Sequence, residues 1–237
     1  MLPKPGVRLL PLNPDVLSQL SKPKMQNDSG LLRWLKIPSV YNVFSAAIGG
    51  NAVRRSLTEN HVRAKTGDKV IDIGCGSGQV LRYLPDVDYL GIDINADYIA
   101  FARRTYGGKG TFLVGDTESF RGDPRFKDAD IVMAFGLLHH LDDEQATHCL
   151  QFAHEALSAQ GRFICYEACW IPNQGAFSKY IMSVDRGRSI RTEEQYRQLA
   201  GKVFNKVDAW VNTNPLRIPY VTIVLECEKD ALPLSEK

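Results

Sequence analysis

The sequence predicts an α/β fold in which helices cover both faces of a mostly parallel β-sheet. Two observations support this prediction. From Gly67 onward, short apolar runs alternate with segments of helical periodicity, which is typical of parallel sheets. The last two apolar runs are separated only by "NTNPLRIP", which is too short for a helical crossover, so we expect them to pair as an antiparallel hairpin.

The expected strands are short runs rich in β-branched and aromatic residues. They are residues 69–73, 88–93, 111–116, 130–135 and 162–168, followed by the hairpin strands 202–211 and 220–228. Helical patterns occupy residues 78–84, 95–106 and 142–159. The last of these begins with acidic residues, which suit a helix N-terminus, and we expect Gly161 to end it.

The N-terminal part is expected to lie outside the sheet. Residues 1–30 hold five of the chain's twelve prolines and predict an irregular leader. A helical cap should follow, broken near Pro38 and at Gly49. The predicted units are the leader 1–30, the N-terminal helical cap 31–66, the sheet domain 67–229 with an insertion at 169–201, and a C-terminal tail 230–237.

Composition gives no sign of a nucleic-acid or membrane protein. The formal net charge is +2, with 44% hydrophobic and 24% charged residues, as in ordinary globular proteins. The five cysteines form no C-x-x-C pair and no zinc spacing, so we expect reduced thiols, a cytoplasmic location and no metal. No signal peptide is recognised, and the most apolar stretch, residues 31–50, contains Arg33 and Lys36, so no membrane span is expected.

The most informative stretch is "VIDIGCGSGQV", residues 70–80. It follows a predicted strand, and Gly74, Gly76 and Gly78 allow a sharp turn close to a ligand. The spacing G-x-G-x-G is not the dinucleotide fingerprint, because Gln79 stands where that pattern needs a later glycine. It is not a phosphate-binding P-loop either, because no Gly-Lys-Ser/Thr follows.

Three acids lie at or near the ends of successive predicted strands. Asp72 precedes the first glycine by two residues and suits a cationic group, such as an ammonium or a sulfonium. Asp93 lies where a carboxylate can bind both hydroxyls of a ribose. Asp116 ends the third run and suits an adenine amino group. Together they predict a site for a nucleoside with a positively charged amino-acid tail, which is S-adenosylmethionine.

Residues 68–228 resemble the class I S-adenosylmethionine-dependent methyltransferases. "GDKVIDIGCGSG" is similar to the family's first motif, "YLGIDIN" and "VGDTESF" to its ribose and adenine segments, "DIVMAFGLLHHLDD" to its fourth motif and "QGRFICYEA" to its fifth strand. The resemblance implies a Rossmann-like, seven-stranded sheet of order 3-2-1-4-5-7-6 with the seventh strand antiparallel. It also implies S-adenosylhomocysteine as product. The whole sequence is similar to bacterial small-molecule methyltransferases with the same arginine motif.

Carried over by position, the resemblance implies a set of cofactor contacts. The methionine part would lie against the glycine loop, the ribose on the acid of the second strand, the adenine on the two segments that follow, and the methyl end near the fourth strand. The residues are Asp72, Gly74, Cys75, Gly76, Gly78, Asp93, Ile94, Asp116, Thr117, Phe135, Gly136 and His140.

Candidates for the chemistry lie at the same edge. Methyl transfer needs a base only if the acceptor must lose a proton, and His139 is the natural candidate near neutral pH. Tyr166 and Glu167 end the fifth run and should point to opposite faces, and we expect Glu167 to face the pocket as a catalytic residue. Tyr166 and Tyr41 of the cap are expected to contact the acceptor. The open alternative for His139 and Tyr41 is ordinary packing.

The insertion contains "DRGRSIRT", in which Arg186, Arg188 and Arg191 lie close together. Thr192 is expected to begin a helix, with Gln195 completing a capping box. The arginines either bind an anionic group of one substrate or sit in a solvated loop. Nucleic-acid binding is disfavoured because no aromatic residues interleave with them.

The sequence therefore predicts methyl transfer from S-adenosylmethionine to oxygen or nitrogen of a small, anionic metabolite. Two alternatives stay open, an RNA or protein methyltransferase and a cofactor-binding regulatory module without turnover. The acceptor and the oligomeric state are not assigned.

Overall fold

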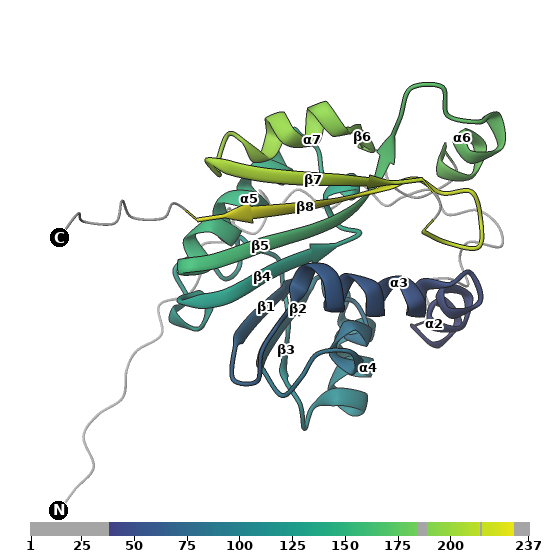
Figure 1. The fold of residues 1–237 in the computed structure, drawn as a ribbon. Helices are drawn as coiled ribbons and strands as arrows, with labels where there is room; N and C mark the ends of the chain where they lie inside the picture. Colours follow the sequence, from purple (N-terminus) through teal and green to yellow (C-terminus); the bar gives the residue numbers. More distant parts are fainter. Residues whose placement is uncertain (1–37, 184–188, 214, 230–237) are drawn as a thin grey trace, which may run out of the picture.

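The computed structural model describes residues 38–183, 189–213 and 215–229, but not the side chains of residues 38–41 and 44 (Figure 1). The predicted leader and tail lie outside the described residues. Within these ranges, none of the helices combines the length and the apolar character that a membrane crossing requires.

A single main sheet runs through the molecule in the order β3-β2-β1-β4-β5-β8-β7. The strands are β1 (Lys69–Ile73), β2 (Asp88–Asp93), β3 (Thr111–Val114), β4 (Ala129–Phe135), β5 (Leu157–Trp170), β7 (Lys206–Asn212) and β8 (Thr222–Glu228). β1 to β5 pair in parallel, whereas β8 pairs antiparallel with both β5 and β7. The predicted order and hairpin are confirmed. The short β6 (Arg191–Thr192), which pairs with β5 outside this path, was not predicted.

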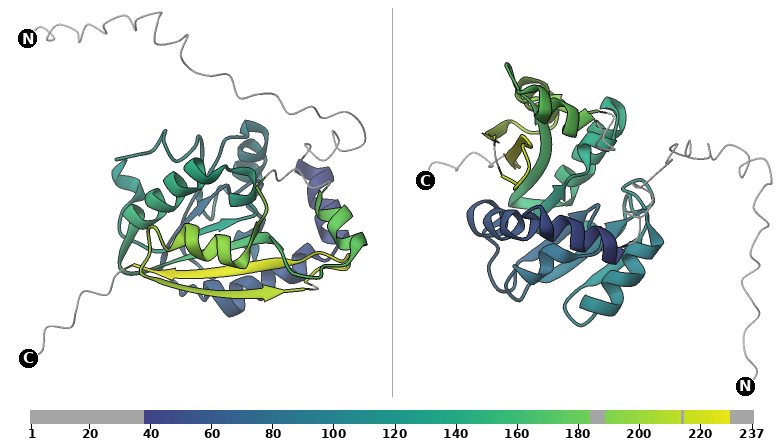
Figure 2. Two further views of the ribbon diagram at one scale, coloured as in Figure 1. Left: turned by 90° about the horizontal axis from the view of Figure 1, so that it is seen from above. Right: turned by 90° about the vertical axis from the view of Figure 1, so that its right-hand side faces the viewer.

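Helices flank the sheet on both sides, as the view from above shows (Figure 2). One face carries α3 (Gly50–Leu57), the π-helical turn η2 (Thr58–Val62), the 3₁₀ turn η3 (Gln79–Arg82) and α4 (Ala96–Tyr106). The other carries η4 (Pro124–Phe126), η5 (Leu138–His140), α5 (Asp143–Ala156) and α7 (Glu193–Ala200). α2 (Pro38–Ala47) and α6 (Ala176–Ser183) lie beyond the end where the parallel strands finish (Figure 1).

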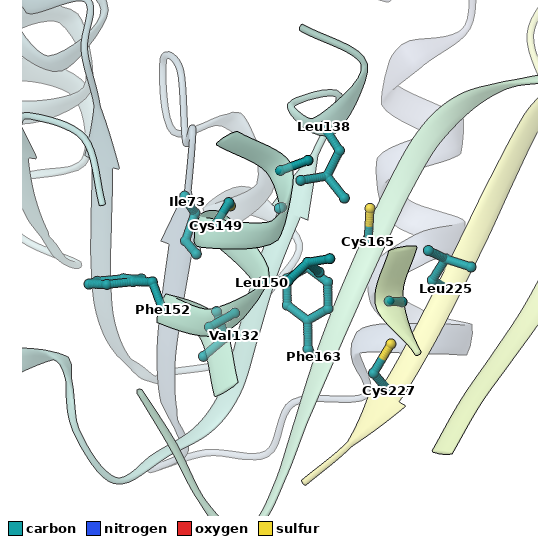
Figure 3. Close-up of a cluster of buried hydrophobic side chains, with 14 of the residues drawn as sticks. Ile73, Val132, Leu138, Cys149, Leu150, Phe152, Phe163, Cys165, Leu225 and Cys227 are labelled. Atoms are coloured by element: carbon teal, nitrogen blue, oxygen red, sulfur yellow. The ribbon is translucent and has the colours of Figure 1, made fainter. Parts of the chain in front are cut away.

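Buried apolar side chains fill the layer between the sheet and α5 (Figure 3). Val132 of β4, Phe163 of β5 and Leu150 of α5 belong to this layer. Ile131 and Met133, the neighbours of Val132 in β4, belong to the opposite layer. Because successive side chains of a strand point to opposite faces, a strand covered on both faces is apolar throughout. This explains the uninterrupted apolar run of β4.

Two local predictions are wrong. The helix expected after the glycine loop is only the turn η3, because Pro85 follows closely and β2 already begins at Asp88. α5 ends at Ala156, and Gly161 lies within β5 instead of ending a helix. A Cβ at Gly161 would come within 2.6 Å of the backbone oxygen of Ala129, so this glycine allows two strands to approach closely.

The N-terminal helical segment breaks at Gly49, whose φ of 98° lies in the left-handed region, and its far end is tied to the sheet by Glu226 of β8. The Glu226 carboxylate lies 2.7 Å from His61 Nδ1 and accepts bonds of 3.0 and 2.6 Å from the two terminal nitrogens of Arg63. Arg162 Nη1 of β5 lies 3.4 Å from the same carboxylate. One acidic side chain therefore joins η2 to β5 and β8.

We expect Glu226→Gln to lower the free energy of unfolding at pH 7 by about 1 kcal/mol. Burial alone would raise the pKa of Glu226, but hydrogen bonds from Arg63 and His61 outweigh it, and the pKa is lowered. A carboxyl with a lowered pKa contributes stability that is lost as the pH falls through the folded value. Denaturant unfolding should therefore show a smaller difference between variant and wild type at about pH 3 than at pH 7. An equal difference at both pH values would contradict this role.

Candidate functional site

The candidate site lies at the carboxyl ends of β1, β2, β4 and β5, which meet at one edge of the sheet. The loop after β1 turns through three glycines with positive φ, Gly74 (73°), Gly76 (54°) and Gly78 (72°). The N–H of Gly74 donates to the backbone oxygen of Ile92, which holds the loop against β2. A Cβ on Gly76 would meet no atom within 4 Å, so a ligand can approach the backbone there.

Asp93, the last residue of β2, organises the two loops beside it. One carboxylate oxygen accepts the N–H of Gly76 (2.9 Å) and the other accepts the N–H of Asn95 (2.8 Å). Each oxygen has a second acceptor position, so the carboxylate can still bind a pair of hydroxyls. Burial raises the pKa of Asp93, and the two backbone hydrogen bonds oppose that shift. The next residue, Ile94, is 77% exposed and offers an apolar surface for a flat ring.

Asp72 lies in β1, two residues before the glycine loop, and is buried. Tyr89 donates its hydroxyl to Asp72 Oδ2 at 2.6 Å. Burial raises the pKa of Asp72 to about 7, the Tyr89 hydrogen bond opposes this shift, and the charge of Asp93 adds to it. Burial also raises the pKa of the Cys75 thiol well above its usual value, so Cys75 is a packing residue and not a reactive thiolate.

Asp116 follows β3 by two residues and is exposed. Its Oδ1 accepts hydrogen bonds from the hydroxyl (2.6 Å) and the N–H (2.8 Å) of Ser119, and these lower the pKa of Asp116. The neighbouring Thr117 is half-buried. Asp116 is therefore held in place as a carboxylate at the rim of the site.

The end of β4 and the part of β5 beside it bring three predicted site residues together. The rings of Phe135 and Tyr166 are adjacent across the two strands, with centroids 6.3 Å apart in an edge-to-face arrangement. Gly136, with a φ of 70°, donates its N–H to the backbone oxygen of Tyr166 at 2.7 Å. This bond sets the direction in which the chain leaves β4.

The side chain of Glu167 in β5 is fully buried and binds the loop that follows β4. Its Oε1 accepts the N–H groups of Leu137 (2.9 Å) and Leu138 (2.8 Å), and its Oε2 accepts the N–H of His139 (3.2 Å). His139 Nδ1 lies 2.5 Å from the same Oε2. The expectation that Glu167 faces the pocket is corrected here, because these contacts turn its carboxylate toward the loop. The exposed His140 ring lies beside that of His139, with centroids 4.1 Å apart.

Arg191 is buried and holds the same loop from its other side. Nε and Nη2 donate to Asp143 Oδ1 (2.9 and 2.7 Å), and Nη2 also donates to the oxygen of Leu141 (2.9 Å). Nη1 donates to the oxygens of Leu138 (2.9 Å) and Ser189 (3.0 Å). A guanidinium has five N–H donors, and these five bonds use them all. The expectation that Arg191 binds an anionic acceptor is therefore corrected, because no donor is left for one.

The other predicted acceptor residues are not all described. Arg186, Arg188 and the side chain of Tyr41 lie outside the described residues. The predicted capping box of α7 is confirmed, since Thr192 Oγ1 accepts the N–H of Gln195 (3.3 Å) and the Gln195 side chain accepts the N–H of Thr192 (2.9 Å).

Two polar residues of α2 and α3 make side-chain contacts that were not predicted. Asn42 Oδ1 of α2 accepts the hydroxyl of Ser77 in the glycine loop at 2.9 Å. Arg54 of α3 donates Nη2 to Ser45 Oγ of α2 at 3.0 Å. Their sequence context gives no signal, because a polar residue on a helix is most often solvated.

Arg54 carries an unsatisfied donor. Within the described part of the chain, its Nη1 is buried and has no hydrogen-bond partner. Its charge acts on Tyr106 of α4, and the Tyr106 ring lies 3.3 Å from the position of a Cβ on Gly78. A buried donor without a partner costs free energy, which an incoming anion would recover.

This edge of the sheet therefore offers groups that fit S-adenosylmethionine. They are the open backbone at Gly76, the paired acceptors of Asp93, the exposed Ile94, the buried acid Asp72 and the unsatisfied nitrogen of Arg54. In the residues covered by the structure, no three His, Cys, Asp or Glu side chains are grouped so that they could hold a metal ion.

Comparison with known proteins also finds similarity to methyltransferases. Residues 70–161 match a family model described as a methyltransferase domain. Over these residues the chain is similar to methyltransferases, and solved methyltransferase structures share its fold. The matched residues run from β1 to the first part of β5 and include the glycine loop, Asp93 and His139.

Two curated relatives of this chain come from Arabidopsis thaliana. Phosphoethanolamine N-methyltransferase 1 is 28% identical over 180 residues, which are 72% of this chain and 34% of that protein. Phosphoethanolamine N-methyltransferase 3 is 26% identical over 178 residues, again 72% and 34%. The chain spans about a third of the length of these relatives.

Solved structures share the fold of this chain. The phosphoethanolamine N-methyltransferase 2 of Haemonchus contortus, in complex with phosphomonomethylethanolamine and S-adenosylhomocysteine, has a TM-score of 0.66 at 14% identity and covers 84% of this chain and 59% of its own. An S-adenosylmethionine-dependent methyltransferase from Archaeoglobus fulgidus has a TM-score of 0.64 at 18% identity and covers 80% of this chain and 99% of its own.

We expect Asp72→Asn to stabilise the ligand-free protein at pH 8. A carboxyl with a pKa raised to about 7 contributes stability that is fully present below its unfolded value and is lost as the pH rises through the folded value. At about 1.4 kcal/mol per pKa unit, the gain at pH 8 should be on the order of a few kcal/mol, and it should be small at about pH 4. Thermal unfolding at both pH values measures it.

Asp116→Asn is the matched control, because the pKa of Asp116 is lowered and not raised. This variant should gain no stability at pH 8. If Asp72→Asn is no more stable than wild type at pH 8, then burial of the Asp72 carboxylate does not destabilise the folded protein.

Proposed function

We propose that this chain transfers a methyl group from S-adenosylmethionine to nitrogen or oxygen of a small, anionic metabolite. The family supports the methyl transfer, and the two curated relatives are named for N-methylation of phosphoethanolamine, which is a small amine with a phosphate group. Phosphoethanolamine is therefore the first acceptor to test.

The observation that carries the proposal is the environment of Asp93. Its carboxylate is fixed by the N–H groups of Gly76 and Asn95, so that its remaining acceptor positions form a preorganised pair for two ribose hydroxyls. Ile94 stands next to it as an exposed apolar surface for the adenine. A bare tight turn would need neither feature.

When bound, the cofactor supplies an electrophilic methyl group on a positively charged sulfur. The chain contributes charges of both signs to hold it. Asp72 would face the cationic part, and because its pKa is about 7, a nearby cation would favour its ionised form. Arg54 Nη1 would take the carboxylate of the methionine part, and Asp116 the adenine amino group.

On the acceptor side, we assign proton removal to His139. An ammonium or hydroxyl acceptor must lose a proton before or during methyl transfer. His139 lies in the loop that follows β4, and its ring is held by Glu167. Tyr41 is proposed as an acceptor contact.

We also propose a cytoplasmic location and an acceptor that is a small molecule, not a polymer. All five cysteines are free, as is usual in reducing compartments. Arg191, which could have belonged to a nucleic-acid patch, is buried in protein contacts.

Calorimetric titration tests the cofactor. We expect both S-adenosylmethionine and S-adenosylhomocysteine to bind, and Asp93→Ala to weaken binding by at least about 1.5 kcal/mol, or more than tenfold, because it leaves two hydroxyls without an acceptor. Asp97→Ala changes a nearby exposed acid on α4 and serves as the control. No binding of either compound at millimolar concentration would overturn the proposal.

Arg54→Met should weaken binding of S-adenosylmethionine about tenfold to a hundredfold, because a charge-assisted hydrogen bond to its carboxylate is lost. The same variant should bind decarboxylated S-adenosylmethionine about as well as wild type does. Arg55→Met is the control, since Arg55 is the exposed neighbour that packs over Tyr83. An equal loss for both cofactor forms would place Arg54 away from the carboxylate.

Mass spectrometry of reactions with phosphoethanolamine tests the acceptor, with total RNA and a protein extract as competing acceptors. We expect methylated phosphoethanolamine and only a weak dependence on ionic strength. Methylation of RNA that falls steeply between low and moderate salt would instead identify a polymer substrate.

A further inference from the structure

We propose that Glu167 and Arg191 are positioning residues that fix His139 as the proton acceptor of the reaction. The inference rests on the proposed function, because proton removal matters only if a methyl acceptor must lose a proton. Both side chains bind the loop between β4 and α5, and each binds a different kind of backbone group. Glu167 takes its N–H groups, whereas Arg191 takes its carbonyl oxygens.

The Glu167 carboxylate orients three successive peptide groups. The N–H groups of Leu137, Leu138 and His139 all converge on its two oxygens at 2.8 to 3.2 Å. Glu167 is fully buried in β5, which is paired on both sides, by β4 and by β8. The anchor is therefore rigid, and charge-assisted hydrogen bonds of this kind are stronger than neutral ones.

The carbonyl side of the loop is held equally firmly. Arg191 donates to the oxygens of Leu138 and Leu141, and the N–H of Ser189 donates to the oxygen of His139 at 3.0 Å. Both backbone groups of His139 are thus bonded, the N–H to Glu167 and the oxygen to Ser189. The segment that contains Arg191 therefore supports the His139 loop directly.

The contact with Glu167 also sets the protonation of the His139 ring. A carboxylate only accepts hydrogen bonds, so Nδ1 must carry the proton and Nε2 must keep its lone pair. When the acceptor nitrogen or oxygen gives up its proton, the proton goes to Nε2 and later to water. The imidazolium formed meanwhile lies against the side chain of Glu167, which stabilises it.

A second His–Glu contact on the same sheet provides a matched control. Glu226 lies 2.7 Å from His61 Nδ1, but it points to the opposite face of the sheet. His61 is 22% exposed, and the pair lies in the contact between η2 and β8, apart from the His139 loop. The same substitution in the two pairs therefore separates a positioning role from a structural one.

Glu167→Gln tests the proposal. The glutamine oxygen can still accept the N–H groups of Leu137 and Leu138, but its NH₂ replaces Oε2 and donates to His139 Nδ1. The ring proton should then move to Nε2, where it blocks proton acceptance. ¹⁵N NMR of the imidazole groups should show this change of tautomer. The turnover number with phosphoethanolamine should fall about a hundredfold or more, with S-adenosylmethionine affinity nearly unchanged.

Glu226→Gln should perturb the His61 resonances and leave the turnover number at the wild-type value. Arg191→Lys should lower the turnover number by about tenfold and keep the Nδ1–H tautomer, because lysine has three donors for the five contacts.

A Glu167→Gln protein that changes the His139 tautomer and keeps the wild-type turnover number would overturn the positioning role. An unchanged tautomer would overturn the assigned hydrogen bond. If wild type does not methylate phosphoethanolamine, the proposed acceptor fails, while the tautomer measurement, which needs no substrate, still decides whether Glu167 sets the state of His139.

Discussion

A buried carboxylate beneath the loop after β4 is the constraint on which the functional edge of the sheet depends. Glu167 accepts three backbone N–H groups and contacts His139 Nδ1, and no water is needed to satisfy it. A buried charge is tolerated only when its hydrogen bonds are complete. These contacts fix the conformation of the loop after β4 and hold His139 against Glu167 of β5.

Two other charged side chains are buried at a cost in free energy. Asp72 is buried with one hydroxyl partner, and Arg54 has a buried nitrogen with no hydrogen-bond partner among the described residues. Both arrangements cost free energy in the ligand-free chain, and both would be relieved by a zwitterionic ligand with a cationic and an anionic end. Asp93, by contrast, is already fixed by two backbone N–H groups. The unfavourable free energy of burial therefore falls on the residues whose charges a bound ligand would offset.

The helices of the N-terminal cap contact the glycine loop and the sheet. Asn42 of α2 bonds Ser77 of the glycine loop, while η2 is tied to β5 and β8 through Glu226. The backbone N–H of Arg217, in the segment between β7 and β8, donates to the oxygen of Ile48. A segment that precedes the sheet in sequence is consequently held to the rest of the protein at three places, and it carries Arg54, which donates to Ser45.

The sequence by itself determined the hairpin, the glycine loop and Asp93, because these features follow from local periodicity, turn chemistry and strand ends. The strand order was implied by the resemblance to the methyltransferases and not by the periodicity. It could not determine the direction of Glu167 and Arg191. The alternation along β5 says that Tyr166 and Glu167 face opposite sides, but which side meets a ligand depends on the helices packed against it. The sequence suggested that Arg191 could bind a ligand, because the backbone oxygens that accept its hydrogen bonds come from residues about fifty positions away. Long-range hydrogen bonds of this kind leave no local pattern, so only the tertiary structure decided which charges support the site and which can bind a ligand.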